Sequence, residues 1–233
     1  MLASLDHLVV GGSVAAYETL LGRRANDGRL RTGNVGLRFE KGAPGLRSMA
    51  FATADLDKEA ALLERRAVTA TRTGDGVAVD GHGVAIGLCA KSDDALSMLA
   101  TDEAAAVASL DHVVVRTPNP ERAVAFYGGR LGLDLRLDRS NPQWGARLLF
   151  FRCGDLVVEI AHDLKKGVSD EPDHLWGLSW RVPDIAAARA RLAKAGLDVS
   201  EPRDGRRPGS QVCTVKNGTE GVATILIGGV GRW

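Results

Sequence analysis

The sequence of 233 residues predicts an α+β fold in which four β-α-β-β-β units pair into two half-open barrels of curled sheet. The first observation is a repeat, because LDHLVV at Leu5 returns as LDHVVV at Leu110. The second is a repeated order of apolar strand, Asp and amphipathic helix, seen in LRSMAFATADLDKEAALLERRAV and LWGLSWRVPDIAAARARLAKAGL. One such unit has an apolar sheet face covered by a helix, and two units side by side can curl around a cleft.

The four units are predicted near residues 4–42, 46–90, 109–163 and 175–229. Asp55 and Asp184 precede the helices of the second and fourth units, and both are predicted N-caps because a carboxylate can accept from the free amides of the first turn. Strand-like segments follow each helix: RLRT and NVGLRFE, then VAVDG and VAIGLCA, then LDLRLDR, ARLLFFR and DLVVEIA, and finally QVCTVK and VATILI. The first unit is the shortest, and we expect it to lack one strand.

Two modules of two units each are therefore predicted, at residues 1–90 and 109–233. The linker between them, residues 91–108, is rich in Ala, which favours a helical connector.

Composition and charge exclude several classes of protein. The chain is 45% apolar and 25% charged with a formal net charge of +1, and it has no cluster of basic residues typical of nucleic-acid binding. Arg206 and Arg207, in DGRRPGS, are expected to lie in a solvated loop. Three widely spaced cysteines favour a reducing compartment over a disulfide framework. Since neither a signal-peptide pattern nor a membrane-length apolar run is present, we predict a soluble cytoplasmic protein without a membrane partner.

The repeated segments resemble those of the glyoxalase/bleomycin-resistance/extradiol-dioxygenase group, also called the vicinal oxygen chelate superfamily. The resemblance is strongest in LDHVVVRTPNPERAVAFYGGRLGL, GDLVVEIAHD and DIAAARARLAKAG, and it covers most of residues 110–228. It implies that paired units hold one divalent ion (Fe, Mn, Zn, Ni or Co) through a His on a first strand and a Glu on a last strand. It also implies that a small-molecule ligand chelates at the open positions of that ion. The resemblance leaves open whether the chain forms a homodimer.

In the C-terminal module, His112 and Glu159 occupy two of the ligand positions that the resemblance implies. Residues two apart in a strand share a face, so both side chains are expected to enter one cleft, as metal ligands or as a catalytic acid–base pair. The matching positions of the fourth unit hold Gly177 and either Ile225 or Thr224. Because Gly and Ile have no ligating side chain, the metal is an optional cofactor in this prediction.

Other candidate residues surround this pair or lie in the N-terminal module. The substrate-binding candidates share a strand face with the cleft or lie on its rim: Trp144, Arg147, Phe151, Ser179 and Arg181. A second candidate site consists of His7 and Glu40, with Ser48 and Gly87 at its other two ligand positions. A lone His on a strand is also typical of a satisfied core residue, and that interpretation stays open for His7.

Three functions follow from this pattern. The first is a lyase or isomerase of glyoxalase type that acts on a small, apolar or aromatic oxygenated metabolite through His112 and Glu159. The second is a non-catalytic protein that binds or sequesters a small molecule, which the missing ligands favour. The third is an extradiol ring-cleavage dioxygenase, which four units in one chain favour, but whose His–His–Glu triad here reads His112, Gly177 and Ile225.

Overall fold

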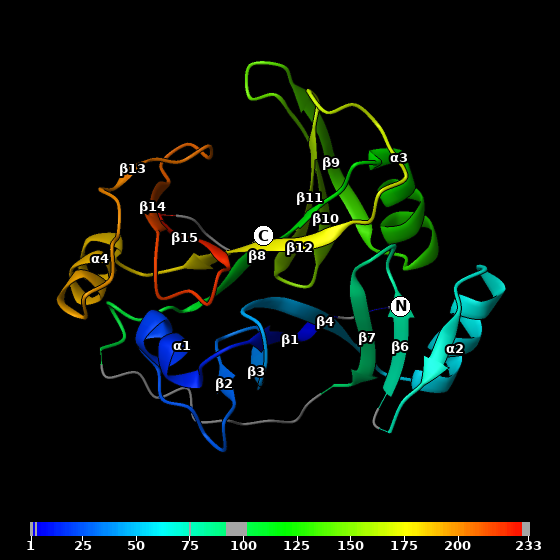
Figure 1. Cartoon of the computed structure of the whole chain (residues 1–233), viewed down its shortest axis with the longest axis horizontal. Helices are drawn as coiled ribbons and strands as arrows, with labels where there is room; N and C mark the ends of the chain where they lie inside the picture. The colour runs from blue at the N-terminus through cyan, green and yellow to red at the C-terminus, as the bar shows by residue number, and fades with distance from the viewer. Residues whose placement is uncertain (1, 3, 75, 92–101, 230–233) are drawn as a thin grey trace.

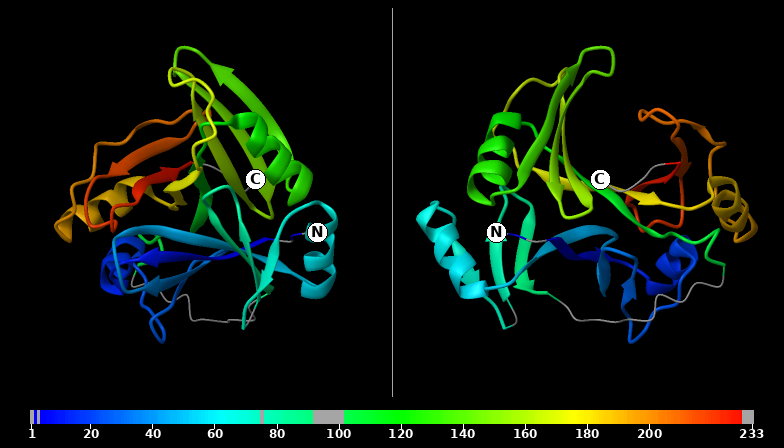
Figure 2. Two further views of the ribbon diagram at one scale, coloured as in Figure 1. Left: turned by 45° about the vertical axis from the view of Figure 1, so that its right-hand side comes forward. Right: turned by 180° about the vertical axis from the view of Figure 1, so that it is seen from behind.

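The computed structural model describes residues 2, 4–74, 76–91 and 102–229. These residues form two mixed sheets, of seven and eight strands, with helices at the two ends of the molecule (Figure 1). In the C-terminal sheet, strands rise on two opposite sides of a curl, and the helices lie outside the curl (Figure 2). The predicted fold class is therefore confirmed.

The N-terminal sheet has the strand order β2-β3-β1-β4-β7-β6-β5. Its first unit consists of β1 (Ser4–Gly11), α1 (Val14–Leu21), β2 (Leu30–Arg31) and β3 (Gly36–Glu40). Its second unit consists of β4 (Gly45–Thr53), α2 (Leu56–Arg65), β5 (Ala70–Arg72), β6 (Gly76–Asp80) and β7 (Ala85–Ala90). Within the described part of the first unit, two strands follow the helix instead of three, as its short sequence predicts.

The C-terminal sheet has the strand order β13-β14-β15-β12-β8-β11-β10-β9. Its first unit consists of β8 (Ser109–Arg116), α3 (Pro120–Ala123), the π-helical segment η1 (Val124–Arg130), β9 (Asp134–Asn141), β10 (Ala146–Cys153) and β11 (Leu156–Asp163). Its second unit consists of β12 (His174–Arg181), α4 (Ile185–Lys194), β13 (Arg203–Asp204), β14 (Gln211–Val215) and β15 (Ala223–Gly228).

Each sheet joins its two units through their first strands. β1 pairs antiparallel with β4, and β8 pairs antiparallel with β12. The last strand of every unit pairs in parallel with the first strand of that unit. This register relates the two units of a sheet by a local two-fold arrangement, so each position in one unit has a counterpart in the other.

The repeated Leu-Asp-His segment carries the same irregularity in both halves. In β8, Leu110 pairs with Trp180 and His112 pairs with Ser179, which leaves Asp111 between two register positions. In β1, the register shifts between Leu5 and His7 in the same way. Such a β-bulge breaks the alternation of side chains, and it allows Asp and His, although consecutive, to contact each other.

The helices of the second and fourth units begin where the sequence predicts. Asp55 accepts from the Lys58 amide at 2.9 Å, and Asp184 accepts from the Ala187 amide at 2.9 Å. Both residues are therefore N-caps, and the helices that follow bury one face against the sheets.

Side chains from the two halves pack together in one apolar core. Asn34, from the N-terminal half, donates to the Leu110 carbonyl and accepts from the Leu110 amide, both at 2.8 Å. Arg191 of α4 donates to the carbonyl of Leu20 at 2.8 Å, which joins α4 to α1. The boundaries of the two modules stay a prediction.

Most of the predicted helical connector falls on residues 92–101, which lie outside the described residues. Residues 102–108 form a turn in which the Ala106 amide donates to the Asp102 carbonyl at 2.9 Å, and Ala105, Ala106 and Val107 are buried. Among the described helices, none has the length and apolar character needed to cross a bilayer.

Candidate functional site

His112 and Glu159 lie together on the inner face of the C-terminal sheet. His112 is on the central strand β8, and Glu159 is two residues beyond Val157, the β11 partner of His112. His112 Nε2 is 3.6 Å from Glu159 Oε2, and the two side chains are 20% and 12% exposed. The period of two along a strand places both groups on one face, and the structure confirms that they converge. We call this surface the His112 face.

Asp111 holds the other side of the His112 ring. His112 Nδ1 is 2.8 Å from Asp111 Oδ2, and because a carboxylate only accepts, Nδ1 carries the proton of this hydrogen bond. Asp111 is fully buried, and it also accepts from Arg181 Nε at 2.8 Å and from Arg207 Nη2 at 2.9 Å. Burial alone would raise the pKa of Asp111, but the hydrogen bonds from His112 and Arg181 and the charges of His112 and Arg207 lower it to about 2. Asp111 is therefore an ionised carboxylate that orients the imidazole.

Two rows of cross-strand neighbours form the His112 face. The first row consists of Leu137, Phe150, Glu159, Val114, Gly177 and Ala223. The second consists of Arg152, Val157, His112, Ser179, Ile225 and Thr214. Leu137 is 48% exposed, and it adds an apolar side chain to this face beside the polar pair.

The side of the His112 face opposite the pair has no ligating side chain at the positions that match His112 and Glu159. The register places Gly177 as the counterpart of His112, and Ile225, two residues after Ala223, as the counterpart of Glu159. Thr224 is buried, and its hydroxyl donates to the Val222 carbonyl at 2.8 Å. A Cβ at Gly177 would lie only 2.7 Å from the Ala223 carbonyl oxygen, so this position accepts no larger residue without a backbone shift.

Three of the predicted substrate-binding residues are placed differently from the prediction. Phe151 is fully buried on the helical side of the sheet, with its ring centroid 5.8 Å from that of Tyr127, whereas its neighbour Phe150 pairs with Glu159. Arg147 donates to Glu121 on α3 at 2.6 Å, and so it also lies on the helical side. Arg181 is buried and bonded to Asp111, and therefore it supports the site instead of lining it.

The other two candidates stay near the His112 face. Ser179 is the β12 partner of His112 and is buried beside it. Trp144 lies in the β9–β10 turn, is 39% exposed, and has two guanidinium groups over its ring, those of Arg139 at 4.9 Å and Arg206 at 4.3 Å. Arg206 and Arg207 were predicted to be merely solvated, but the first stacks on Trp144 and the second pairs with buried Asp111.

The N-terminal half has the same dyad with different surroundings. His7 Nδ1 is 2.8 Å from Asp6 Oδ2. His7 pairs with Gly36, so the counterpart of Glu159 is Arg38, while Glu40 pairs with Gly11 at the far end of the strand. The predicted pairing of His7 with Glu40 is therefore wrong. Glu40 would match Glu159 only if it lay two residues beyond the β3 partner of His7, but it lies four residues beyond that partner, Gly36. Ser48 and Gly87 stand at the two remaining positions, as predicted.

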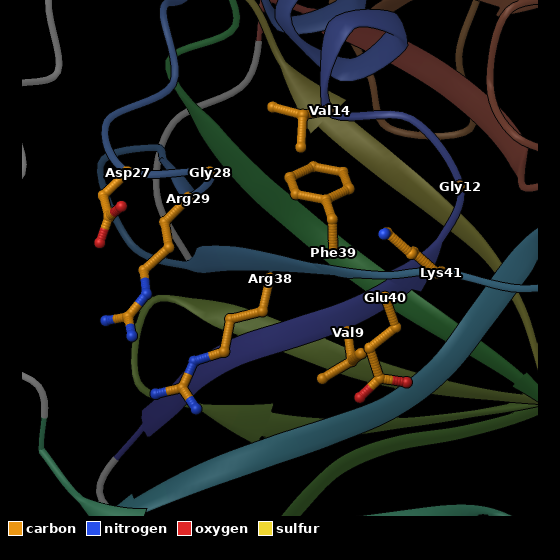
Figure 3. A pocket seen from close by; sticks show the side chains of 10 residues that line it. All are labelled: Val9, Gly12, Val14, Asp27, Gly28, Arg29, Arg38, Phe39, Glu40 and Lys41. Carbon is orange, nitrogen blue, oxygen red and sulfur yellow. The ribbon is translucent and has the colours of Figure 1, made fainter.

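A groove of about 640 Å³ lies on the N-terminal half around Phe39 (Figure 3). It is lined by Val9, Gly12, Val14, Asp27, Gly28, Arg29, Arg38, Phe39, Glu40 and Lys41. His7 does not line the groove. Glu40 and His7 therefore do not share this pocket.

The donor set on the His112 face does not fit the divalent-metal centre that the family resemblance implies. Catalytic zinc takes three protein ligands, and facial iron sites take two His and one carboxylate. Here His112 and Glu159 supply two, and Gly177 and Ile225 supply none. Among the residues that the structure describes, donor atoms of three potential ligands lie within 4.8 Å of one another only in Asp6, His7 and Cys89 of the N-terminal half.

Sequence reasoning missed four residues of this site. Asp111 was visible in the Leu-Asp-His repeat, but the bulge that turns it toward His112 was not. Phe150 was missed because residues 148–151 of β10 are all apolar. In such a run the sequence does not show which side chains face the inside of the curl. Arg206 and Arg207 left no local signal, since their partners lie in other parts of the chain.

Comparisons with known proteins agree with this architecture. A family model described as "Glyoxalase/Bleomycin resistance protein/Dioxygenase superfamily" matches residues 111–214. An ethylmalonyl-CoA/methylmalonyl-CoA epimerase from Cereibacter sphaeroides is 28% identical over 109 residues, which are 42% of this chain and 81% of the relative.

Two solved structures resemble the whole chain. BphC, a halotolerant catechol dioxygenase, has a TM-score of 0.73 at 12% identity, covering 100% of this chain and 88% of that one. A mutant of 4-hydroxymandelate synthase from Streptomyces coelicolor has a TM-score of 0.75 at 13% identity, covering 99% and 94%. At these identities the likeness concerns the fold alone. The chain thus has the vicinal oxygen chelate fold, and its residues 111–214 match the model of the glyoxalase/bleomycin resistance protein/dioxygenase superfamily.

Proposed function

We propose that the His112 face is the active site of a lyase or isomerase that moves a proton in a small, apolar or aromatic oxygenated metabolite. The observation that carries the proposal is the oriented pair itself. Asp111 accepts a hydrogen bond from Nδ1–H of His112, and Nε2 lies 3.6 Å from the Glu159 carboxylate, inside the curl of the sheet and away from the described helices (Figure 2).

The chemistry that this pair supports is general base catalysis. When a C–H group next to a carbonyl lies against Nε2, its proton passes to His112 and its electron pair passes to the carbonyl oxygen as an enolate. The imidazolium that forms lies between Asp111 and Glu159, and both carboxylates stabilise it. Return of the proton to the carbon skeleton completes an isomerisation, or loss of a leaving group completes an elimination. The Ser179 hydroxyl, beside His112, is the candidate donor to the enolate oxygen.

The epimerase relative supports this reaction class. Epimerisation next to a thioester carbonyl requires removal and return of a proton on carbon, which is the chemistry that a positioned base provides. No step of the proposal uses a divalent ion, because the donor set is incomplete. For the same reason extradiol cleavage is the least supported of the three functions.

Binding without chemistry is the second candidate function. Gly177 and Ile225 remove polar groups from one side of the His112 face, and Leu137 adds exposed apolar surface. Apolar walls with few polar groups are typical of sites that hold drug-sized molecules. A homodimer stays a prediction.

Exchange of a substrate proton with D2O, followed by NMR, separates the two functions. The probes are hemithioacetals of 2-oxoaldehydes and thioesters with an acidic α-carbon. His112→Ala is expected to lower the exchange rate by about 10²–10⁴-fold. His7→Ala, the matched control from the other half, is expected to leave it unchanged. Metal content is measured on every sample.

Equal exchange rates in His112→Ala and the unmodified chain would contradict the enzyme proposal. Saturable binding of a probe without any exchange would favour the second candidate function instead.

A further inference from the structure

Two arginines from the last unit clamp the carboxylate that orients His112. Arg181 reaches Asp111 from the end of β12, and its Nη2 also donates to the Asp155 carbonyl at 2.6 Å. Arg207 reaches both carboxylate oxygens of Asp111, at 3.2 and 2.9 Å. Asp111 belongs to one unit of the sheet and both arginines belong to the other, so the clamp crosses the junction between them.

The two halves share the dyad but differ at the position of Arg181. Asp6 and His7 have the same 2.8 Å contact as Asp111 and His112. Arg181 pairs with Ser109, and the matching partner of Ser4 is Ala52. The Arg181 position therefore holds an alanine in the other half, and the arginine there is specific to the candidate site.

Arg207 belongs to a short segment with a fixed shape, residues 203–210, which we call the strap. Its first two residues, Arg203 and Asp204, pair with β14, and the Gly205 amide donates to the carbonyl of Ser210, its last residue, at 2.9 Å. Its turn is closed by Ser210, whose hydroxyl donates to the Arg207 carbonyl at 2.7 Å and whose amide donates to the same carbonyl at 3.0 Å. A Cβ at Gly205 would lie 2.2 Å from the Ser210 hydroxyl, so a larger residue there would displace this hydroxyl from its bond to the Arg207 carbonyl.

The strap makes two contacts with the other unit through consecutive side chains. Arg207 points inward to buried Asp111, and Arg206 stacks on Trp144 of the β9–β10 turn at 4.3 Å. Arg207 thus contacts the carboxylate that holds His112, and Arg206 contacts the tryptophan in the turn between β9 and β10. Any displacement of the strap removes both contacts together.

We infer that Asp111 is the positioning residue for His112, and that the docked strap holds Asp111 in place through Arg207, so that docking of the strap sets the tautomer of His112. The inference rests on the proposed function for its catalytic meaning. Its physical basis is that the partner of Nδ1 decides which ring nitrogen is the base. A buried carboxylate that loses one of its cationic partners is costly, and it relaxes toward the remaining one. Arg181 would then draw Asp111 away from Nδ1.

Nitrogen-15 NMR of the histidine rings in the full chain tests this without any substrate. The variants are Asp111→Asn and Arg207→Gln, and the second changes a partly exposed side chain that the fold tolerates more easily. In both we expect the Nδ1–H form of His112 to lose its dominance, so that the Nε2–H signal appears. Asp6→Asn is the matched control, and it is expected to change the signals of His7 and leave those of His112 as they are.

Activity gives a second readout. Arg207→Gln is expected to lower kcat of the proton-exchange reaction by about tenfold with KM little changed, whereas Arg207→Lys restores part of the loss. An unchanged His112 tautomer in folded Asp111→Asn and Arg207→Gln samples would overturn the inference, even if activity depends on His112. A tautomer change without any His112-dependent activity would keep the positioning role and reject the proposed function.

Discussion

Arg38 occupies in the N-terminal half the register position that Glu159 occupies in the C-terminal half. Each lies two residues beyond the strand partner of the first-strand histidine, Gly36 for His7 and Val157 for His112. A guanidinium neither accepts a proton nor ligates a cation. The two halves therefore share an Asp–His dyad, but only the C-terminal half completes it with a carboxylate.

Replacing Glu159 by the arginine of the other half, or by a neutral glutamine, tests what the charge of Glu159 contributes to the reaction. Glu159→Arg is expected to lower the His112-dependent exchange rate further than Glu159→Gln does, because a positive neighbour disfavours the imidazolium formed in the reaction. The measurement is kcat for both variants, with thermal unfolding as the control for folding. Equal losses would show that the charge is not used.

Phe150 and Phe151 are expected to separate ligand binding from stability. Phe151→Ala removes a fully buried ring and should reduce the free energy of unfolding by about 3–5 kcal/mol. Phe150→Ala changes the His112 face and should raise KM with a smaller loss of stability. Urea unfolding and steady-state kinetics on both variants check this, and the reverse ranking would contradict the assignment of faces.

Acid should weaken the fold through Asp111. Its folded pKa, about 2, lies below the ordinary value of 3.8, so its ionised form stabilises the fold above about pH 4, and this stabilisation is lost as the pH falls toward 2. The contribution is about 2 kcal/mol. In Asp111→Asn the group does not titrate, so the difference in unfolding free energy between the two proteins should shrink by that amount from pH 5 to pH 2. A difference that does not vary with pH would contradict it.

Gly177→Ala should destabilise the protein by about 1–3 kcal/mol, because the added methyl meets the Ala223 carbonyl at 2.7 Å. Gly129→Ala is the matched control, since outside its own helical turn no heavy atom lies within 4 Å of its Cβ position. It should be neutral or stabilising by up to about 1 kcal/mol. Chemical denaturation measures the unfolding free energy of both variants. An unchanged stability of Gly177→Ala would show that a ligating side chain could be accommodated at this position.

Trp144→Ala should raise KM of the exchange reaction and lower kcat less than Arg207→Gln does, because it removes the contact with Arg206 of the strap and leaves the Arg207–Asp111 contact in place. Arg206→Ala removes one stacked guanidinium and should cost at most about 1 kcal/mol of stability. A fall in kcat larger than that of Arg207→Gln would place the ring nearer to the chemistry than we propose.

The internal repeat and the resemblance to the superfamily are enough to predict the fold and the central pair. The resemblance implies the positions of His112 and Glu159 and of their counterparts, Gly177 and Ile225 or Thr224, and the period of two along strands predicts that His112 and Glu159 converge. Asp55 and Asp184 are also predictable, since an N-cap acts within its own first turn.

The alternation of side chains along a strand does not predict which face a residue occupies when the strand has no polar residue. It also does not predict contacts with residues that are distant in the sequence. The run from Leu148 to Phe151 is apolar throughout, so only its register with β11 decides that Phe150 faces inward. Glu40 was misassigned because the register of β3 depends on its pairing with β1. Arg207 contacts a residue 96 positions away in the sequence, and no local pattern predicts such a contact.

The bulge at the repeated Leu-Asp-His segment has a consequence for how such chains diversify. Because the bulge brings consecutive Asp and His side chains within reach of each other, both copies of the Leu-Asp-His segment, in β1 and in β8, carry an aspartate–histidine dyad whatever their other neighbours are. Divergence then needs only to change what stands across from it, and a copy can gain or lose reactivity while its backbone stays the same.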